Sequence, residues 1–297
     1  MWTHKQHEGL QVLRGGAESG RWVVLIPGLV GDVDALESLC RELASTHRLL
    51  SWSPRGLYGS APPADGDYAF GGWLDDLHGL LVRYDIQDAL LIGWSAGGRV
   101  AIEASARWPD RVAGAVSIAG TWGRPFEELL HAVLDPGSSL FAVLSQASAG
   151  VAAGFRLPKW ARAAARSTVI AGLLKAFRVT ADTTEGRRLS ELIARSLDND
   201  LHALLATWRG VSRRGRQPLD ADLLRPTLWF AGDHDVLTRV DEARAAATGD
   251  QTTFLTVPGG THFLPLDQPE LIHLQIRRFE RRLGAWPAGD SANPAAD

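Results

Sequence analysis

Cysteine, methionine and tyrosine are scarce in this chain of 297 residues, which has one cysteine, one methionine and three tyrosines. The single cysteine, Cys40, cannot form an internal disulfide, so disulfide bonds within the chain are excluded as a source of stability. No run reaches about 18 unbroken apolar residues, and residues 1–9 lack the apolar core of a signal peptide. We therefore expect a cytoplasmic protein without a membrane span.

Neither sign of charge is in large excess, because 31 lysines and arginines nearly balance 34 aspartates and glutamates. The net charge of −3 at pH 7 does not favour nucleic acid as a partner, and we expect none. Hydrophobic residues make up 45% of the chain. That content is enough for a large core, either in one α/β domain with an insertion or in two small domains.

Short β-rich runs alternate with helical patterns along most of the chain. Apolar residues recur at helical spacing in residues 33–45 and 72–84. Six strands are expected, at residues 22–26, 48–52, 89–93, 114–119, 227–231 and 252–257. Alternation of this kind is typical of the α/β class, with a mostly parallel doubly wound sheet and crossover helices.

Between the fourth and fifth of these strands lie roughly 100 residues without a convincing strand, which is too long for an ordinary connection. We expect residues 122–219 to form a helical cap over the carboxyl ends of the strands, where open α/β sheets bind ligands. Its clearest helical pattern covers 159–178. The α/β core would then comprise residues 1–121 and 220–284, followed by a flexible tail at 285–297.

The predicted cap is basic, with 14 lysines and arginines against 8 aspartates and glutamates. An excess of this size usually belongs to a solvated face. The alternative is electrostatic attraction of an anionic substrate or an anionic acyl carrier. The sequence leaves both interpretations open.

A serine stands where an apolar strand is expected to turn sharply into a helix. Gly93, Ser95 and Gly97 follow the pattern Gly-x-Ser-x-Gly directly after the apolar run that begins at residue 89. Glycines two positions before and after the serine let the strand and the helix pass closely. Ser95 is thus a candidate nucleophile, although a Gly-rich turn without catalytic function can carry the same five residues.

Several segments resemble the α/β-hydrolase fold superfamily, and they follow one another along the chain in the order that is usual for this superfamily. One of them, residues 53–60, is similar to the family pattern Asp-x-Arg-Gly-x-Gly-x-Ser, with Ser53 in place of the usual aspartate. Pro27 stands where the family often has histidine. The other similar segments are residues 26–31, 91–98, 108–112, 226–235 and 258–269. The resemblance implies the α/β-hydrolase fold with a helical cap, and functional residues in the order Ser, Asp, His.

A serine hydroxyl needs a neighbouring base, and that base needs a carboxylate to orient it. His262 is the candidate base, because it follows a predicted strand in a Gly-rich loop near the C-terminus. Asp233 and Asp235 both follow a buried strand and compete as the acid. The resemblance places the acid three residues after Gly232, which favours Asp235. Asp233 is expected to stabilise the turn through backbone hydrogen bonds.

The resemblance also implies an oxyanion hole formed by the backbone N–H groups of Leu29 and Ala96. The apolar residues that flank these positions predict an apolar substrate pocket, although each of them could equally pack in the core. They are Val30, Trp94, Trp122, Phe263 and Leu264. The Asp-His-Asp stretch at 233–235 has no partner cluster at ligand spacing, so we expect no metal and no cofactor.

These residues predict a serine hydrolase that cleaves carboxylic esters of small to medium apolar acyl groups through an acyl-enzyme, with a small-molecule ester as its substrate. A thioesterase or a carrier-protein methyl esterase is an alternative, because the elbow sequence resembles that of carrier-protein methyl esterases. Carbon–carbon bond hydrolysis, perhydrolysis and ligand binding without catalysis are further alternatives, because a fold does not determine a function. The serine argues against the dehalogenase and epoxide hydrolase branches, in which the resemblance implies an aspartate at this position.

Overall fold

The computed structural model describes residues 2–123, 156, 159, 183–219 and 225–284. An eight-stranded sheet crosses the molecule in the order β1-β2-β4-β3-β5-β6-β7-β8. The strands are β1 (Trp2–His7), β2 (Leu10–Gly16), β3 (Trp22–Ile26), β4 (Arg48–Trp52), β5 (Ala89–Trp94), β6 (Val112–Ile118), β7 (Thr227–Gly232) and β8 (Thr252–Val257). The six strands from β3 to β8 are parallel, and the predicted α/β class with a mostly parallel sheet is confirmed.

The first two strands form an antiparallel hairpin that the sequence did not reveal, and β2 also pairs antiparallel with β4. The turn between them places Glu8 and Gly9 at positive φ, which suits a tight hairpin turn. Most side chains of β1 are exposed at the sheet edge. A solvated edge strand needs no apolar alternation, so the pattern that identified the other strands is missing there.

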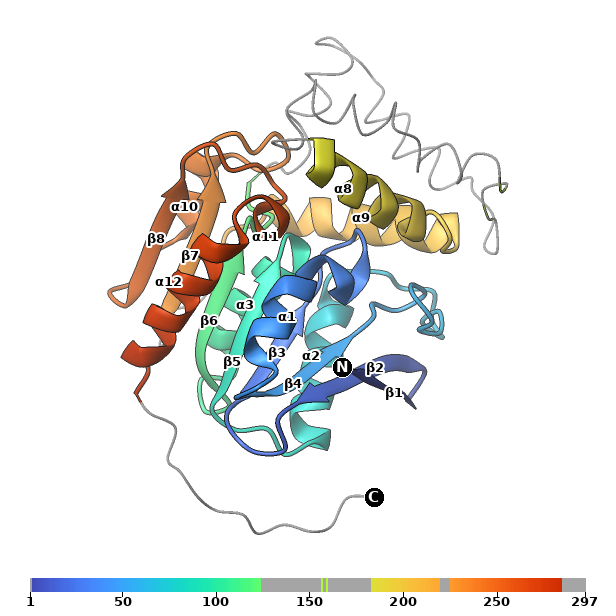
Figure 1. Ribbon diagram of the computed structural model, residues 1–297. Helices are drawn as coiled ribbons and strands as arrows, with labels where there is room; N and C mark the ends of the chain where they lie inside the picture. The colour runs from blue at the N-terminus through green and yellow to red at the C-terminus, as the bar shows by residue number, and fades with distance from the viewer. Residues whose placement is uncertain (1, 124–155, 157–158, 160–182, 220–224, 285–297) are drawn as a thin grey trace.

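Helices cover both faces of the sheet (Figure 1). Val24 and Ile26 of β3 pack in one apolar cluster with α2 and α3, whereas Val23 and Leu25 pack in the other cluster with α1 and α12. Successive side chains of a strand point to opposite faces, so a strand covered on both sides is apolar throughout. The helices are η1 (Asp32–Leu36), α1 (Glu37–Leu43), α2 (Gly71–Arg83), α3 (Ala96–Arg107), α10 (Val240–Ala246), α11 (Leu264–Asp267) and α12 (Pro269–Arg282).

Two helices of the predicted insertion are described, α8 (Thr183–Ser196) and α9 (Leu201–Gly215). They lie at the end of the sheet where the parallel strands have their carboxyl ends, with α8 against η1, the segment that follows β3 (Figure 1). The helix expected at 159–178 and the tail at 285–297 fall outside the described residues, apart from residue 159. The boundaries of the cap and of the core remain predictions.

Buried ion pairs tie α9 to α3. Arg99 is fully buried and donates to Glu103 at 2.7 Å, while Arg214 donates to both carboxylate oxygens of Glu103 at 2.7 Å each. Arg99 also donates to the backbone carbonyls of Gly215, the last residue of α9, and of Gln217, just after it. A buried carboxylate that joins two guanidinium groups holds the end of α9 at a defined position on α3.

In the described parts of the chain, no helix combines the length and apolarity needed to cross a membrane.

Candidate active site

Ser95 lies at a sharp turn between β5 and α3, with φ 56° and ψ −121°. A positive φ is strained for any residue other than glycine, and such strain is concentrated at functional sites. A Cβ atom on Gly93 would overlap the carbonyl of Gly97, and one on Gly97 would overlap the carbonyl of Ile26. The two glycines therefore allow β3, β5 and α3 to approach closely enough to raise Ser95 above the end of the sheet.

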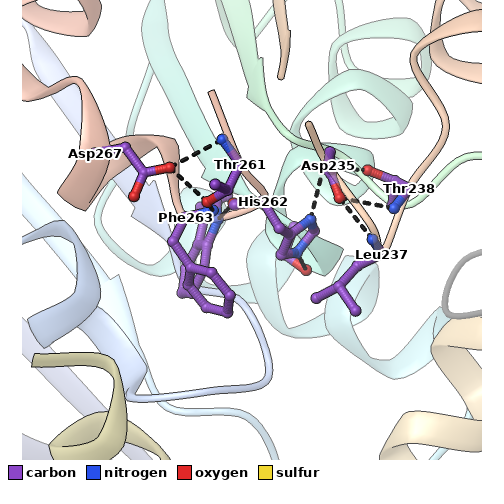
Figure 2. Close-up of polar contacts among 9 residues, drawn as sticks. Asp235, Leu237, Thr238, Thr261, His262, Phe263 and Asp267 are labelled. Carbon is purple, nitrogen blue, oxygen red and sulfur yellow. Dashed lines mark hydrogen bonds and ion pairs between the residues drawn. The ribbon is translucent and has the colours of Figure 1, made fainter. Parts of the chain in front are cut away.

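Three polar side chains from distant segments meet at this turn. His262, which follows β8, places its Nε2 atom 2.9 Å from the Ser95 Oγ atom. The His262 Nδ1 atom lies 2.9 Å from Oδ2 of Asp235, which follows β7 (Figure 2). Ser95 and His262 are only 6% and 3% exposed, and the Asp235 side chain is fully buried. The structure thus joins the predicted nucleophile, base and acid in one hydrogen-bonded line with little contact with water.

The Asp235 carboxylate receives hydrogen bonds from its own loop as well as from the imidazole. The backbone N–H groups of Leu237 and Thr238 donate to Oδ1 at 2.8 and 2.9 Å, and the Thr238 hydroxyl donates to Oδ2 at 2.7 Å (Figure 2). Asp233 is exposed and accepts the Gly259 N–H at 2.7 Å. The two competing aspartates thus have different surroundings, with Asp235 against the imidazole and Asp233 at a turn.

The loop that carries His262 is held by Trp94, which the sequence predicted only as a pocket residue, and by Asp267, which it did not single out. The Trp94 indole N–H donates to the His262 carbonyl at 2.8 Å. Thr261 donates to the Asp267 carboxylate through both its backbone N–H and its hydroxyl (Figure 2). Trp94 and Asp267 lie one residue before the nucleophile and five after the histidine, but nothing in that spacing indicates these hydrogen bonds.

The predicted pocket residues are mostly packed in the interior. Trp94, Phe263 and Leu264 are buried, while Val30 is half-buried. Trp122 is also buried, with its ring centroid 4.6 Å from that of Trp229. A hollow of about 530 Å³ lies between residues 66–71 and α9, and none of these five residues lines it. Their contact with a substrate remains a prediction.

The two predicted oxyanion donors, Leu29 and Ala96, belong to segments next to the Ser95 turn. Ala96 is the first residue of α3, where helix geometry leaves a backbone N–H without an acceptor in its own helix. Leu29 follows Gly28, whose position is so close to the elbow that an added Cβ would lie 3.0 Å from the Ser95 Cβ atom. The Ser95 N–H itself donates to the Ile118 carbonyl at 2.9 Å. The geometry is compatible with an anion held between Leu29 and Ala96.

A buried carboxylate follows the Leu29 loop, residues 27–31, which connects β3 to η1. Asp32 is 6% exposed and accepts a hydrogen bond from the Ser53 hydroxyl at 2.7 Å. Burial raises the pKa of Asp32 from 3.8 to about 6, while the hydrogen bonds from Ser53 and the Val33 backbone and the charge of Arg195 act in the opposite direction. Ser53 is the residue that departs from the family pattern, and here its hydroxyl serves as a donor to this neighbouring aspartate.

Asp32→Asn should change how the free energy of unfolding depends on pH. Because the folded-state pKa is raised, the stability contributed by the protonated carboxyl is complete below 3.8 and is lost as the pH rises through about 6. The variant cannot ionise, so its stability relative to the unchanged protein should increase by about 2–3 kcal/mol between about pH 4 and pH 7. Urea unfolding across this range measures the difference. The exposed Asp110→Asn variant is the control, and an equal slope for both would contradict the expectation.

Comparison with known proteins identifies a family whose model matches most of this chain and two relatives with similar sequences. A family model described as alpha/beta hydrolase fold matches residues 21–269. A 2-(acetamidomethylene)succinate hydrolase from Mesorhizobium japonicum is 24% identical over 265 residues, which span 88% of this chain and 88% of that protein. A pimeloyl-[acyl-carrier protein] methyl ester esterase from Shewanella woodyi is 39% identical over 64 residues, which span 22% of this chain and 23% of that protein.

A solved structure has a similar fold. That of a thermophilic esterase from Thermogutta terrifontis superimposes with a TM-score of 0.69 at 21% sequence identity. The match covers 95% of this chain and 99% of that one. At this level of identity the likeness concerns the fold.

Proposed function

Because this chain belongs to the α/β-hydrolase fold family, we propose that it is a serine hydrolase of carboxylic esters with small to medium apolar acyl groups. The observation that supports this proposal is the line of hydrogen bonds from Ser95 through His262 to Asp235, with 2.9 Å between successive partners. A hydroxyl that contacts an imidazole oriented by a buried carboxylate is the arrangement that activates serine as a nucleophile.

In the proposed reaction, the Ser95 oxygen attacks the ester carbonyl while its proton passes to Nε2 of His262. Asp235 accepts a hydrogen bond from Nδ1–H, which selects the tautomer and stabilises the imidazolium. The N–H groups of Leu29 and Ala96 would bind the oxygen that becomes negative. The C–O bond then breaks, and the leaving alkoxide takes the proton from His262. Water, deprotonated by the same imidazole, next attacks the acyl-enzyme and releases the acid and Ser95.

Apolar side chains around the elbow support an acyl group without charge. Val30 belongs to the loop of Leu29, while Phe263 and Leu264 directly follow His262. Half-buried and buried apolar groups at these positions leave few polar partners for a hydrophilic acyl chain. We infer that the substrate is a small-molecule ester with an apolar acyl part.

A thioester or carrier-bound ester is the second candidate, and the charge of the insertion favours it. Helices α8 and α9 together carry six arginines and two glutamates. Two of these arginines are paired with acidic residues of the core, Arg195 with Asp34 and Arg214 with Glu103. An excess of arginine on these helices would attract an anionic acyl carrier, and the partial match to a carrier-protein methyl esterase agrees with this candidate.

A panel of p-nitrophenyl esters from acetate to palmitate tests the proposed activity. We expect turnover that is fastest for short to medium chains. A fluorophosphonate probe should label the protein at Ser95, as mapped by mass spectrometry. Absence of both turnover and labelling would reject the serine hydrolase in favour of ligand binding.

The second candidate is tested with methyl esters of an acyl carrier protein and with acyl thioesters at low and high salt. A preference for these substrates that disappears at high salt would favour the carrier-bound ester, because salt screens the attraction between exposed charges. Labelling of Ser95 without turnover of any ester or thioester would indicate another reaction of the same residues, such as carbon–carbon bond hydrolysis or perhydrolysis.

A further inference from the structure

The hydroxyl of Tyr58 joins three segments that are distant in the sequence. It donates to the Leu29 carbonyl at 2.9 Å and accepts the Gly31 N–H at 2.9 Å. It also lies 2.7 Å from the hydroxyl of Ser196, at the end of α8. The backbone N–H of Tyr58 donates to the Asn199 side chain at 2.6 Å. One tyrosine thus connects the loop that carries Leu29 with the helix of the predicted cap.

Tyr58 has a strained backbone conformation, which indicates a role for its side chain. Its φ is 49°, in the left-handed region that favours glycine. In the family pattern Asp-x-Arg-Gly-x-Gly-x-Ser, aligned from Ser53, the second glycine coincides with Tyr58, and Gly59 follows it. A glycine would adopt this backbone at lower cost, so strain at a bulky residue points to a role for the side chain.

The loop contacted by Tyr58 is itself in an unusual conformation. Gly31 has φ 82° and Asp32 has φ 56°. An added Cβ on Gly31 would meet the Leu192 side chain of α8, so the loop and the helix are in close contact. Such a backbone persists only when surrounding contacts hold it. Tyr58 supplies two of these contacts, and Ser196 supplies a third by accepting the Gly31 N–H at 3.0 Å.

The hydroxyls of Tyr58 and Ser196 have different roles, because each of them can donate only one hydrogen bond. Each hydroxyl has one proton to donate. The Leu29 carbonyl is satisfied by the Tyr58 proton, which leaves the Ser196 proton for either the Tyr58 oxygen or the Leu192 carbonyl at 2.9 Å. Loss of the Tyr58 hydroxyl therefore frees the Leu29 carbonyl, whereas loss of the Ser196 hydroxyl removes the contacts that Tyr58 and the Gly31 N–H make with α8 but keeps the contact between Tyr58 and Leu29. Burial raises the pKa of Tyr58 to about 12, so the phenol remains a donor at neutral pH.

We propose that Tyr58 is a positioning residue that holds the Leu29 loop in the conformation required of an oxyanion hole, and that it makes this conformation depend on the seating of α8 against the core. The inference rests on the proposed function, since it takes Leu29 as an oxyanion donor. The N–H and the carbonyl of Leu29 are joined through its Cα atom. A hydrogen bond that fixes the carbonyl therefore limits the rotation of the N–H. A cap helix displaced from Gly31 and Tyr58 would loosen the loop.

Tyr58→Phe tests the positioning role with almost no change of volume. We expect kcat for the best p-nitrophenyl ester to fall about tenfold with KM nearly unchanged, because a donor shifted by a fraction of an ångström stabilises the transition state less. Inhibition by a trifluoromethyl ketone, which forms a hemiketal oxyanion on serine, should weaken in parallel with kcat/KM. A role confined to stability would lower the melting temperature without changing that affinity.

Two further variants complete the comparison. Tyr84→Phe is the matched control, because Tyr84 lies at the end of α2 with its ring against Arg14, and its kcat should be unchanged. Ser196→Ala should lower kcat about threefold, since the tyrosine contact to Leu29 remains. An unchanged kcat and inhibitor affinity in Tyr58→Phe would overturn the positioning role. Unchanged values in Ser196→Ala would overturn the dependence on α8.

A readout without substrate separates this inference from the proposed function. Amide hydrogen exchange at residues 29–31 should become about tenfold faster in Tyr58→Phe than in Tyr84→Phe, because the loop opens more often. Equal exchange in the two variants overturns the inference, whatever the protein hydrolyses. Faster exchange in a protein without ester turnover would instead reject the proposed function and retain the role of Tyr58 in the loop.

Discussion

Ser95→Ala should lower kcat for p-nitrophenyl esters by about 10⁴- to 10⁶-fold, because the variant has no oxygen to form the acyl-enzyme. The turn should survive, since alanine carries the same Cβ as serine at φ 56°. Residual hydrolysis above the uncatalysed rate would come from the oxyanion donors and substrate binding alone. Initial rates under saturating ester, with a thermal unfolding curve for the folded fraction, measure the effect.

Ser105→Ala is the matched control for this substitution. Ser105 is a buried serine of α3, the helix that follows Ser95, and its hydroxyl donates to the Ile102 carbonyl of that helix. We expect its kcat to remain within about twofold of the unchanged protein, because loss of one local hydrogen bond affects stability more than chemistry. If Ser95→Ala were as active as Ser105→Ala, the proposed nucleophile would be wrong.

Asp235→Asn should lower kcat by about 10⁴-fold, the second-largest effect expected. The amide cannot accept at both of its terminal atoms, yet the loop and the imidazole present four donors to this side chain. His262 would then be held in the wrong tautomer, with a proton on the nitrogen that must receive one from Ser95. The pH–rate profile with a short-chain ester measures the loss.

Asp233→Asn separates the two aspartates of this loop. Its Oδ1 atom accepts the Gly259 N–H, and an asparagine oxygen can do the same. We expect a fall in kcat of less than about threefold, together with a small loss of stability. A greater loss of activity in Asp233→Asn than in Asp235→Asn would show that the acid has been assigned to the wrong residue.

Much of the core could be read from the sequence because its strands are covered on both faces. The central parallel strands β3, β5, β6 and β7 are buried along their whole length, and the six expected strands correspond to β3 to β8 with ends that differ by no more than about two residues. The family resemblance is confirmed by the match over residues 21–269. The edge strand β1 was missed because an exposed edge strand carries no apolar pattern.

Some features of the candidate site are encoded locally in the sequence, whereas others depend on the order of the strands in the sheet. The turn at Ser95 is encoded locally, because the glycines at 93 and 97 decide which backbone conformations and approaches are possible. Asp235 and His262 could be chosen from their loops only with the help of the family order. Their hydrogen bonds to each other and to Ser95 result from the order of the parallel strands, which brings the ends of β5, β7 and β8 to one edge.

The sequence by itself determined the α/β core, the sharp turn and the residue types suited to hydrolysis, because these depend on patterns within a few neighbouring residues. Only the tertiary structure decided which residues support them. Trp94 holds the carbonyl of His262, 168 residues away, and Tyr58 meets Ser196 across 138 residues. Such contacts depend on how whole elements pack against one another, and no short segment of the chain contains that information.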